Sequence, residues 1–250
     1  VGIIAKTNNW QQLLIITNRA FEKKIINKRE FQDNKSIGFF EIAKIKQFSE
    51  INESIGLLEK ALNLRKNFPP YIKLYVELLI KDKNYNLAKK YLKKMWIVNP
   101  HNEYKSMIKK LSSCLNESYI DLVKFIISNN TTKEISKILL IDAAIESKKW
   151  DLARNEIKTL LDLQPKKEVC LLMARIEAGD TGEMQKVNSW NLRSKNGLEK
   201  NAWVCLISNQ IQEEWSPVSR AGNFNSLVWK QPNMLDRFDN SNSSLSYDNK

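Results

Sequence analysis

The chain has 250 residues, of which 42% are hydrophobic and 27% are charged, and its formal net charge is +12. This composition can bury a sizeable core and excludes a wholly disordered protein. With seven glycines and six prolines, the chain has too few turn residues for a many-stranded β protein, so we expect long helices joined by short turns.

The first predicted elements are helices that begin almost at the first residue. A helical pattern covers Gly2 to Lys6, and Trp10 followed by apolar residues at helical spacing predicts a second helix. No run of about 18 apolar residues occurs, so we expect no segment of this sequence to span a bilayer. Because the chain begins at Val1 and not at a methionine, we expect that the N-terminal part of a longer protein precedes it.

A helical repeat of about 34 residues runs through the middle of the chain. Its clearest copies, residues 85–100 and 150–165, each run from an aromatic residue to a proline. A step of 34 residues back from Tyr85 predicts a further copy that starts at Ile51 and ends at Phe68-Pro69-Pro70, and a step forward predicts one that starts at Tyr119. This period is the length of a tetratricopeptide (TPR) unit, in which two helices form a hairpin and neighbouring hairpins stack.

A last helix pair is predicted at residues 168–178 and 182–194, with Gly179-Asp180 in the turn between them. Residues 1–195 are therefore predicted to form an all-α, TPR-like solenoid of helix-turn-helix units. A single unit of this kind does not fold alone, because its apolar face is covered only by its neighbours.

The pattern changes after residue 197 to short alternating segments, which predict strands at residues 203–208 and 226–230. We expect residues 198–232 to form a small β ribbon that packs as a cap on the last helix pair. Residues 233–250 contain mostly Asn, Asp and Ser with little apolar content, and we predict that they form a disordered tail.

The predicted ribbon has the layout of a zinc ribbon without its ligands. Two Cys-x-x-Cys hairpins would hold the metal in an intact ribbon, and here the first pair is Cys205 and Ser208. The second pair begins at Ser219, with Gly222 roughly where its last ligand should stand. One thiol cannot hold a structural zinc ion, so we predict a degenerate ribbon with no metal site.

Two sequence blocks resemble the HemY-type TPR proteins of bacterial inner membranes. The first is a Val-Cys-x-Leu-Met-Ala helix followed by Gly-Asp, and the second is the ribbon with its Trp-Ser-Pro-Val motif. The residues that carry the resemblance are Val169–Glu177, Gly179-Asp180, Trp203-Val204-Cys205, Trp215-Ser216-Pro217-Val218 and Phe224–Trp229.

The resemblance implies a membrane-anchored scaffold whose C-terminal region faces the cytoplasm and associates with late haem biosynthesis. The resemblance also implies membrane helices, which we expect in a segment that precedes the first residue of this chain. Expected partners are other proteins, including haem-biosynthesis or membrane proteins.

No residue pattern predicts an enzyme or a bound cofactor. His101 is interpreted as a solvated turn residue, and Cys114 and Cys170 as small buried hydrophobic residues. Direct haem binding would depend on His101, the cysteines and the methionines as axial ligands. Asp142 and Glu146 share a helix face at i, i+4 spacing, which permits acid–base chemistry but is more typical of contacts with water or a partner's lysine. We predict no catalytic residue, no metal ligand and no cofactor.

The remaining function is protein recognition. A TPR stack presents a groove lined by the first helix of each pair, and the residues predicted to point into it are Lys73, Glu77, Asp142 and Glu146. The alternative is a basic module that binds nucleic acid or an anionic membrane surface through the charge of +12, although no nucleic-acid-reading motif is present.

Overall fold

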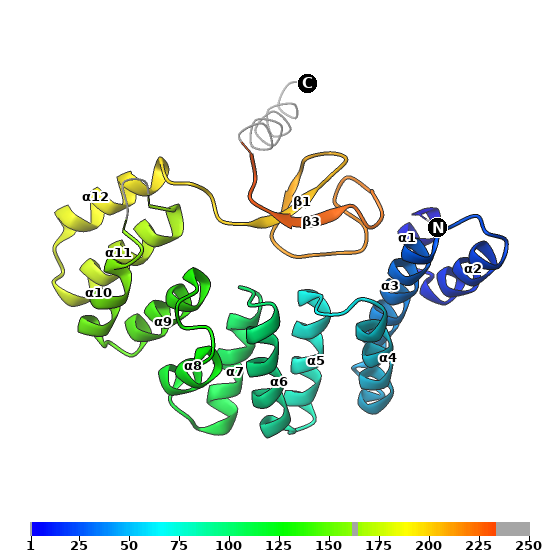
Figure 1. Cartoon of the computed structure of the whole chain (residues 1–250), viewed down its shortest axis with the longest axis horizontal. Helices are drawn as coiled ribbons and strands as arrows, with labels where there is room; N and C mark the ends of the chain where they lie inside the picture. The colour runs from blue at the N-terminus through cyan, green and yellow to red at the C-terminus, as the bar shows by residue number, and fades with distance from the viewer. Residues whose placement is uncertain (1, 162–164, 234–250) are drawn as a thin grey trace, which may run out of the picture. The chain divides into compact units, whose positions relative to one another are not determined.

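The computed structural model describes residues 2–161 and 165–233, which contain twelve helices and three short strands (Figure 1). The predicted helical fold with a small C-terminal sheet is confirmed. The chain divides into two compact units: unit 1 comprises the residues up to Lys66 and the segment from Lys200 onward, and unit 2 comprises Asn67–Glu199. The prediction of one solenoid over residues 1–195 did not include this boundary. Apart from Asn233, the predicted disordered tail lies outside the described residues.

The helical part of unit 1 is a sequence of packed antiparallel neighbours. Helix α3 begins with a capping box, in which Asn27 and Glu30 each accept a hydrogen bond from the other's backbone N–H at 2.9 Å. Gly38 lets α3 approach α2, since a Cβ there would lie 2.6 Å from a methyl carbon of Leu14. The described helices of this unit are α1 (Gly2–Lys6), α2 (Trp10–Glu22), α3 (Lys28–Lys46) and α4 (Ile51–Leu64).

The sheet of unit 1 has three antiparallel strands in the order β2-β1-β3. Strand β1 (Ala202–Cys205) and strand β3 (Leu227–Lys230) match the two predicted strands, and β2 (Ile211–Gln212) completes the first hairpin. Trp203 pairs with Trp229 across β1 and β3, and the two ring centroids lie 5.3 Å apart. Aromatic cross-strand pairs of this kind stabilise a small sheet.

The ribbon contacts the first helices of the chain. The ring of Trp215 meets Phe40 of α3 edge to face at 5.6 Å, and Asn225 accepts a hydrogen bond from Arg65 just after α4. The sequence pattern predicts the last helix pair as the partner of the ribbon, whereas these described contacts of Trp215 and Asn225 lie with helices of their own unit, where α3 supplies the apolar partner for Trp215.

Unit 2 consists of four helix hairpins. Within the described residues they are α5 (Pro69–Lys81) with α6 (Tyr85–Val98), α7 (Tyr104–Leu115) with α8 (Tyr119–Ile127), α9 (Glu134–Glu146) with α10 (Trp150–Lys158), and α11 (Lys167–Asp180) with α12 (Met184–Lys195). None of the described helices in either unit is long and apolar enough to cross a membrane.

The two clearest predicted repeats share one turn geometry. Lys83 and Lys148 both adopt the left-handed conformation, at φ of 61° and 53°, two residues before the aromatic that opens the second helix. The next backbone N–H then donates back to the first helix at 2.8 Å in both turns, which satisfies a carbonyl at its end. Ala88 and Ala153, three residues after the aromatic, are fully buried. The repeat predicted from Tyr85 and Trp150 is thus confirmed.

The prolines bound the helices less regularly than predicted. Pro100 directly follows the end of α6, whereas α10 ends at Lys158, well before Pro165. Pro69 and Pro70 do not end α4 but occupy the first turn of α5, where a missing backbone N–H costs no helical hydrogen bond.

The predicted Gly179-Asp180 turn is wrong, because both residues belong to the last turn of α11. Gly179 faces the ring of Trp150: a Cβ would lie 3.0 Å from two ring carbons and closer still to a third. Arg154 donates to both oxygens of the buried Glu177 carboxylate at 2.9 and 3.1 Å and to Asp180 at 2.8 Å. The last turns of α11, which carry Glu177, Gly179 and Asp180, therefore contact α10 through Trp150 and Arg154.

Replacing Gly179 with Ala should lower the free energy of unfolding by about 1–3 kcal/mol, because the new methyl group would press into the Trp150 ring. The matched control is Gly56→Ala in α4, where no atom lies within 4 Å of the new Cβ. That change should raise stability by about 0.5–1 kcal/mol through helix propensity. Chemical denaturation of both variants measures the difference, and equal shifts would contradict the Trp150 contact.

Candidate functional site

Eight charged side chains form a continuous row across the first helices of the four hairpins in unit 2. We call this set the charged row. Ion pairs between neighbouring helices and the walls of one shared depression place them on the same face. The members are Lys73 and Glu77 of α5, Lys105, Lys109 and Lys110 of α7, Asp142 and Glu146 of α9, and Arg175 of α11.

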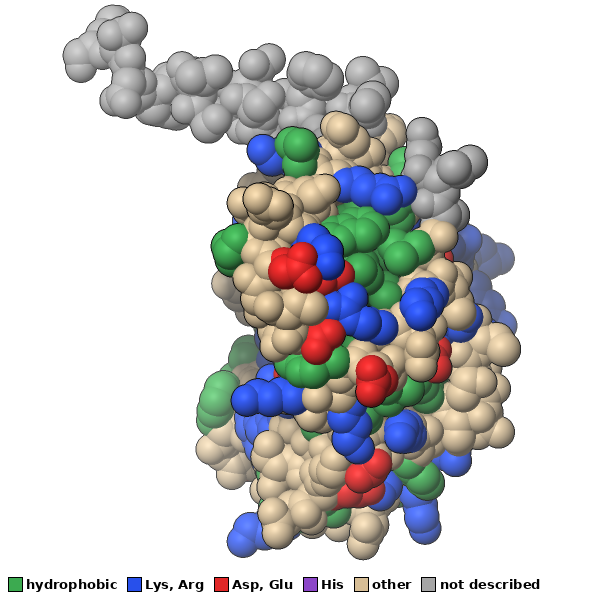
Figure 2. Space-filling model, turned by 90° about the vertical axis from the view of Figure 1, so that its left-hand side faces the viewer, with side chains coloured by type: hydrophobic (Ala, Val, Ile, Leu, Met, Phe, Trp, Pro, Cys, Tyr) green, Lys and Arg blue, Asp and Glu red, His purple; other side chains and the backbone are tan. Residues whose placement is uncertain are grey.

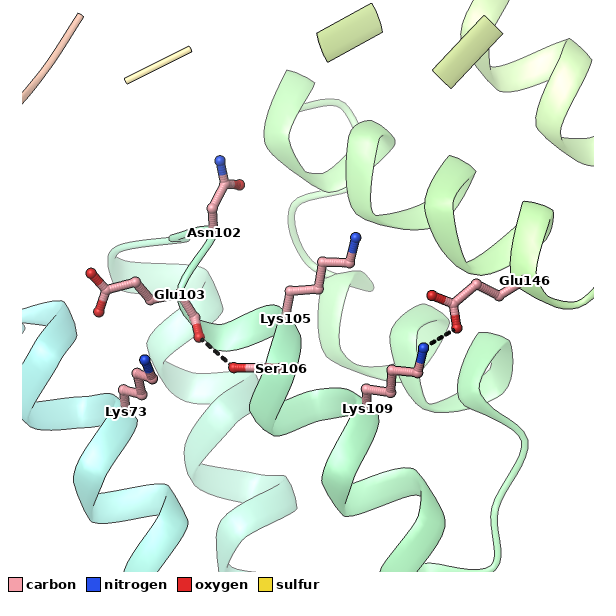
Figure 3. A pocket seen from close by; sticks show the side chains of 7 residues that line it. All are labelled: Lys73, Asn102, Glu103, Lys105, Ser106, Lys109 and Glu146. Carbon is pink, nitrogen blue, oxygen red and sulfur yellow. Dashed lines mark hydrogen bonds and ion pairs between the residues drawn. The ribbon is translucent and has the colours of Figure 1, made fainter. Parts of the chain in front are cut away.

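An open depression of about 430 Å³ lies within the charged row (Figure 3). Lys73 reaches it from α5 and Glu146 from α9, while the start of α7 and the turn before it form the floor. A depression of this volume has room for a few side chains and not for a whole domain. Its lining residues are Lys73, Asn102, Glu103, Lys105, Ser106, Lys109 and Glu146.

Asp142 is the most buried member of the charged row, with 2% of its surface exposed. Arg175 donates to its Oδ1 at 2.6 Å, and Nζ of Lys105 lies 2.8 Å from its Oδ2. One carboxylate thus links α7, α9 and α11. The nearby Tyr119 hydroxyl has a raised pKa, mainly because of burial and also because the charges of Asp142 and Glu146 disfavour a second anion.

The other carboxylates of the charged row are also paired within the chain. Glu146 lies 2.7 Å from Nζ of Lys109, and Glu77 lies 3.8 Å from Lys81 and 3.9 Å from Lys110. The structure brings Lys73 and Glu146 to one depression and places Glu77 and Asp142 in the ion pairs beside it. Asp142 and Glu146 were predicted to contact a partner's lysine or water. In the structure both carboxylates are already paired with lysines of α7.

The sequence prediction missed the basic members of the charged row on α7 and α11. Lys105 and Lys109 have the same i, i+4 spacing as Asp142 and Glu146, so the two pairs can meet residue for residue. That matched spacing was a readable signal. The repeat pattern does not place these lysines opposite α9, because Tyr119 is the repeat landmark of this hairpin and lies after α7.

In the ribbon, hydroxyl groups surround the single thiol. Sγ of Cys205 lies 3.2 Å from Oγ of Ser226 and 3.6 Å from Oγ of Ser219, and it accepts from the backbone N–H of Ser208 at 3.5 Å. Burial alone would raise the pKa of the Cys205 thiol. The hydrogen bonds from Ser208, Ser226 and Ser219 outweigh it and lower the pKa to about 6.

The two hairpin turns of the ribbon differ in length by one residue. The first closes between Cys205 and Gln210, whereas the second closes between Ser219 and Asn223, each through an N–H to carbonyl bond of 2.9 Å. The last loop residue is left-handed in both, Asn209 at φ 56° and Gly222 at φ 79°. Gly222 therefore corresponds in backbone conformation to Asn209, the residue after Ser208, and not to Ser208 itself.

Two further sequence interpretations need correction. His101, predicted to be a solvated turn residue, is 4% exposed; its Nδ1 accepts from the backbone N–H of Glu103 at 3.3 Å, and its ring lies near Tyr104. Burial lowers the pKa of His101 to about 4. Cys114 is exposed, not buried, whereas Cys170 is buried as predicted, and burial raises the pKa of its thiol.

Within residues 2–161 and 165–233, no three His, Cys, Asp or Glu side chains gather as they would around a metal ion. Basic and acidic side chains are interleaved on the face that Figure 2 shows. The lysines of α6 divide into two groups. Lys89 and Lys93 cover the ring of Phe125, and Lys89 also pairs with Glu117, while Lys90 and Lys94 are exposed.

No protein-family model and no curated protein matches the chain. Solved structures do. A TPR protein from Parabacteroides merdae shares 15% identity over 77% of this chain and 74% of its own, with a TM-score of 0.39. The C-terminal part of a TPR protein from Cytophaga hutchinsonii shares 17% identity over 77% of this chain and 75% of its own, with a TM-score of 0.41. PilF of Pseudomonas aeruginosa shares 15% identity over 78% of this chain and 87% of its own, with a TM-score of 0.37.

The helix hairpins of this chain and the turn that they repeat are those of a TPR-like fold. The fold is TPR-like. Folds of this kind expose the first helix of each hairpin along one face, and in this TPR-like chain that face carries the charged row.

Proposed function

We propose that this chain is a non-enzymatic scaffold that binds other proteins through the charged row of unit 2. The observation that carries the proposal is the open depression among charged side chains from three successive hairpins. TPR-like stacks use such faces to hold extended or helical segments of partners. Nothing in the geometry of Asp142 and Glu146 favours catalysis, because each carboxylate is already paired with a lysine.

Site-specific photo-crosslinking tests the proposal. A benzophenone amino acid at the exposed Ser106, which lines the depression, should capture a defined protein partner in cells of the native source. The same amino acid at Lys90, which is exposed on α6 and does not line the depression, should not capture that protein. Equal capture from both positions, or none from Ser106, would reject the charged row as the binding face.

We further propose that the protein is a HemY-type scaffold of the bacterial inner membrane whose described region faces the cytoplasm and associates with haem biosynthesis. Support comes from the ribbon, whose tryptophan pair and two facing turns agree with a zinc ribbon that has lost its ligands. Two measurements test this: recovery of the native protein in the inner-membrane fraction, and haem-pathway enzymes among the proteins captured from Ser106. Haem content unchanged by deletion would contradict the pathway assignment.

A second candidate function is binding to nucleic acid or to anionic membranes, and the exposed lysines of α6 favour it. Such binding would depend on counterion release, so affinity for DNA, RNA or acidic vesicles should fall steeply between about 50 and 200 mM salt. The variant Lys90→Gln/Lys94→Gln should weaken it. Partner capture from Ser106 that persists at moderate salt while no nucleic acid or vesicle binds would exclude this candidate.

A further inference from the structure

We infer that the charged row binds an extended acidic segment of its protein partner, with carboxylates spaced to match the successive hairpins. The inference rests on the proposed function and adds the chemistry and the spacing of the ligand. The charged row is not simply neutral: it contains five basic and three acidic side chains, from Lys73 to Arg175.

The acidic and the basic side chains of the charged row differ in how much of their surface is exposed to solvent. The side chain of Asp142 is 3% exposed, and those of Glu146 and Glu77 are 28% and 29% exposed. The side chains of Lys105, Lys110 and Arg175 are each 45% exposed, and that of Lys109 is 56% exposed. The cations of these ion pairs are therefore more exposed than the carboxylates, and a partner meets more basic than acidic side-chain surface.

The buried Asp142 and the partly exposed Glu146 also organise the surface for anions, because each holds cations in place. Asp142 holds Arg175 and Lys105, and Glu146 holds Lys109, so these long side chains have lost part of their rotamer freedom before a partner binds. A second carboxylate then gains a charge-assisted hydrogen bond at a smaller entropic cost. Each cation can donate this additional hydrogen bond, because ammonium and guanidinium groups carry several donors.

The stacking of the hairpins sets the spacing of the ligand. Helices α5 and α7 pack on each other, as do α9 and α11, and the ion pairs of Lys105 and Lys109 hold α7 beside α9. Packed helices lie about 8–10 Å apart, and an extended chain advances about 3.3 Å per residue, so neighbouring first helices correspond to about three residues of a bound strand. Cations stand on α5, α7 and α11, whereas α9 presents carboxylates. A matching segment has acidic residues at positions 1, 4 and 10 and a neutral residue at position 7.

A protein segment fits this face better than nucleic acid does. Among the side chains that line the depression there is no aromatic ring on which a base could stack, and two of them are glutamates that would repel a continuous phosphate backbone. A strand with a neutral residue opposite α9 places no carboxylate against Glu146.

Fluorescence anisotropy with synthetic peptides tests the inference. The probes are ten-residue Ser/Ala peptides with Glu at positions 1, 4 and 10 or at 1, 7 and 10, which represent the two chain directions, and an isomer with Glu at positions 1, 2 and 3. One spaced peptide should bind at least about tenfold more tightly than the grouped isomer. Lys109→Gln should weaken that binding about fivefold or more, whereas Lys90→Gln/Lys94→Gln should leave it unchanged.

Three results would overturn the inference: equal binding of the spaced and grouped peptides, equal losses in both variants, or tighter binding of single-stranded DNA at the same face. Thermal unfolding of Lys109→Gln should show a cooperative transition, because a half-exposed lysine can be replaced without unfolding the chain. A failure of this inference can be distinguished from a failure of the proposed function. If Ser106 captures a partner whose crosslinked segment lacks acidic residues, the acidic ligand is wrong and the scaffold stands; if Ser106 captures none, the scaffold itself fails.

Discussion

Acidification from pH 7 to pH 4 should lower the free energy of unfolding by about 3 kcal/mol through His101 alone. Burial lowers the pKa of this imidazole from 6.5 to about 4 in the folded chain. Between those pH values the unfolded chain binds a proton that the folded chain does not, so stability falls as the pH decreases through this window. A difference of about 2.5 pKa units corresponds to about 3 kcal/mol.

The matched variant for this measurement is His101→Gln, which keeps a polar side chain that can accept from the N–H of Glu103 but does not titrate. Urea denaturation of both chains at pH 7, 5.5 and 4 separates the effect of His101 from that of the carboxylates, which both chains share. The native chain should lose more stability than the variant on acidification. Parallel losses would show that His101 titrates normally and is not buried in solution.

Introducing three thiols into the ribbon should create a zinc site, as expected if the proposed zinc-ribbon ancestry is correct. The change is Ser208→Cys and Ser219→Cys with one cysteine inserted between Ala221 and Gly222, which gives the second turn the length of the first. Sγ of Cys205 already lies 3.6 Å from Oγ of Ser219. Two thiolates of a tetrahedral zinc site are separated by about 3.8 Å, given Zn–S bonds of about 2.3 Å. The variant should bind one zinc ion and unfold at a higher temperature when zinc is present.

The control for the zinc experiment is the same double substitution without the insertion. It offers three thiols and should bind zinc much more weakly, because structural sites are almost always four-coordinate. Elemental analysis and melting curves with and without chelator provide the measurement. If the inserted cysteine adds nothing to zinc affinity, the one-residue difference between the two turns is not the missing ligand position.

The hairpins of unit 2 were predictable because their turn chemistry is local. An aromatic residue, a buried alanine three residues later and the repeat length lie within one stretch of sequence, as in Tyr85 and Ala88. The boundary at Lys66 and the placement of the ribbon against α3 were not predictable. They depend on contacts between residues as distant in sequence as Phe40 and Trp215, for which no periodicity exists.

The candidate site was predictable only in part. The face of α5 and α9 followed from helical periodicity, which placed Lys73 and Asp142 on the inner side. The cations that cover the carboxylates were missed, since the start of α7 has no aromatic or proline landmark at the repeat spacing. The environment of His101 was missed for another reason: a turn residue is usually exposed, whereas this ring is buried, with Tyr104 among its neighbours.

The contact of Gly179 with Trp150 and the bonds from Arg154 to α11 bear on how the chain opens. In a helical-repeat protein the terminal hairpin has a neighbour on one side only, so it is the first to fray unless its single interface is strong. A ring packed on a glycine and a guanidinium with three hydrogen bonds raise the nearest-neighbour coupling at this interface. Helices α11 and α12 are therefore expected to unfold together with α10 and not separately. Unit 2 then lacks a low-energy local unfolding step at this hairpin.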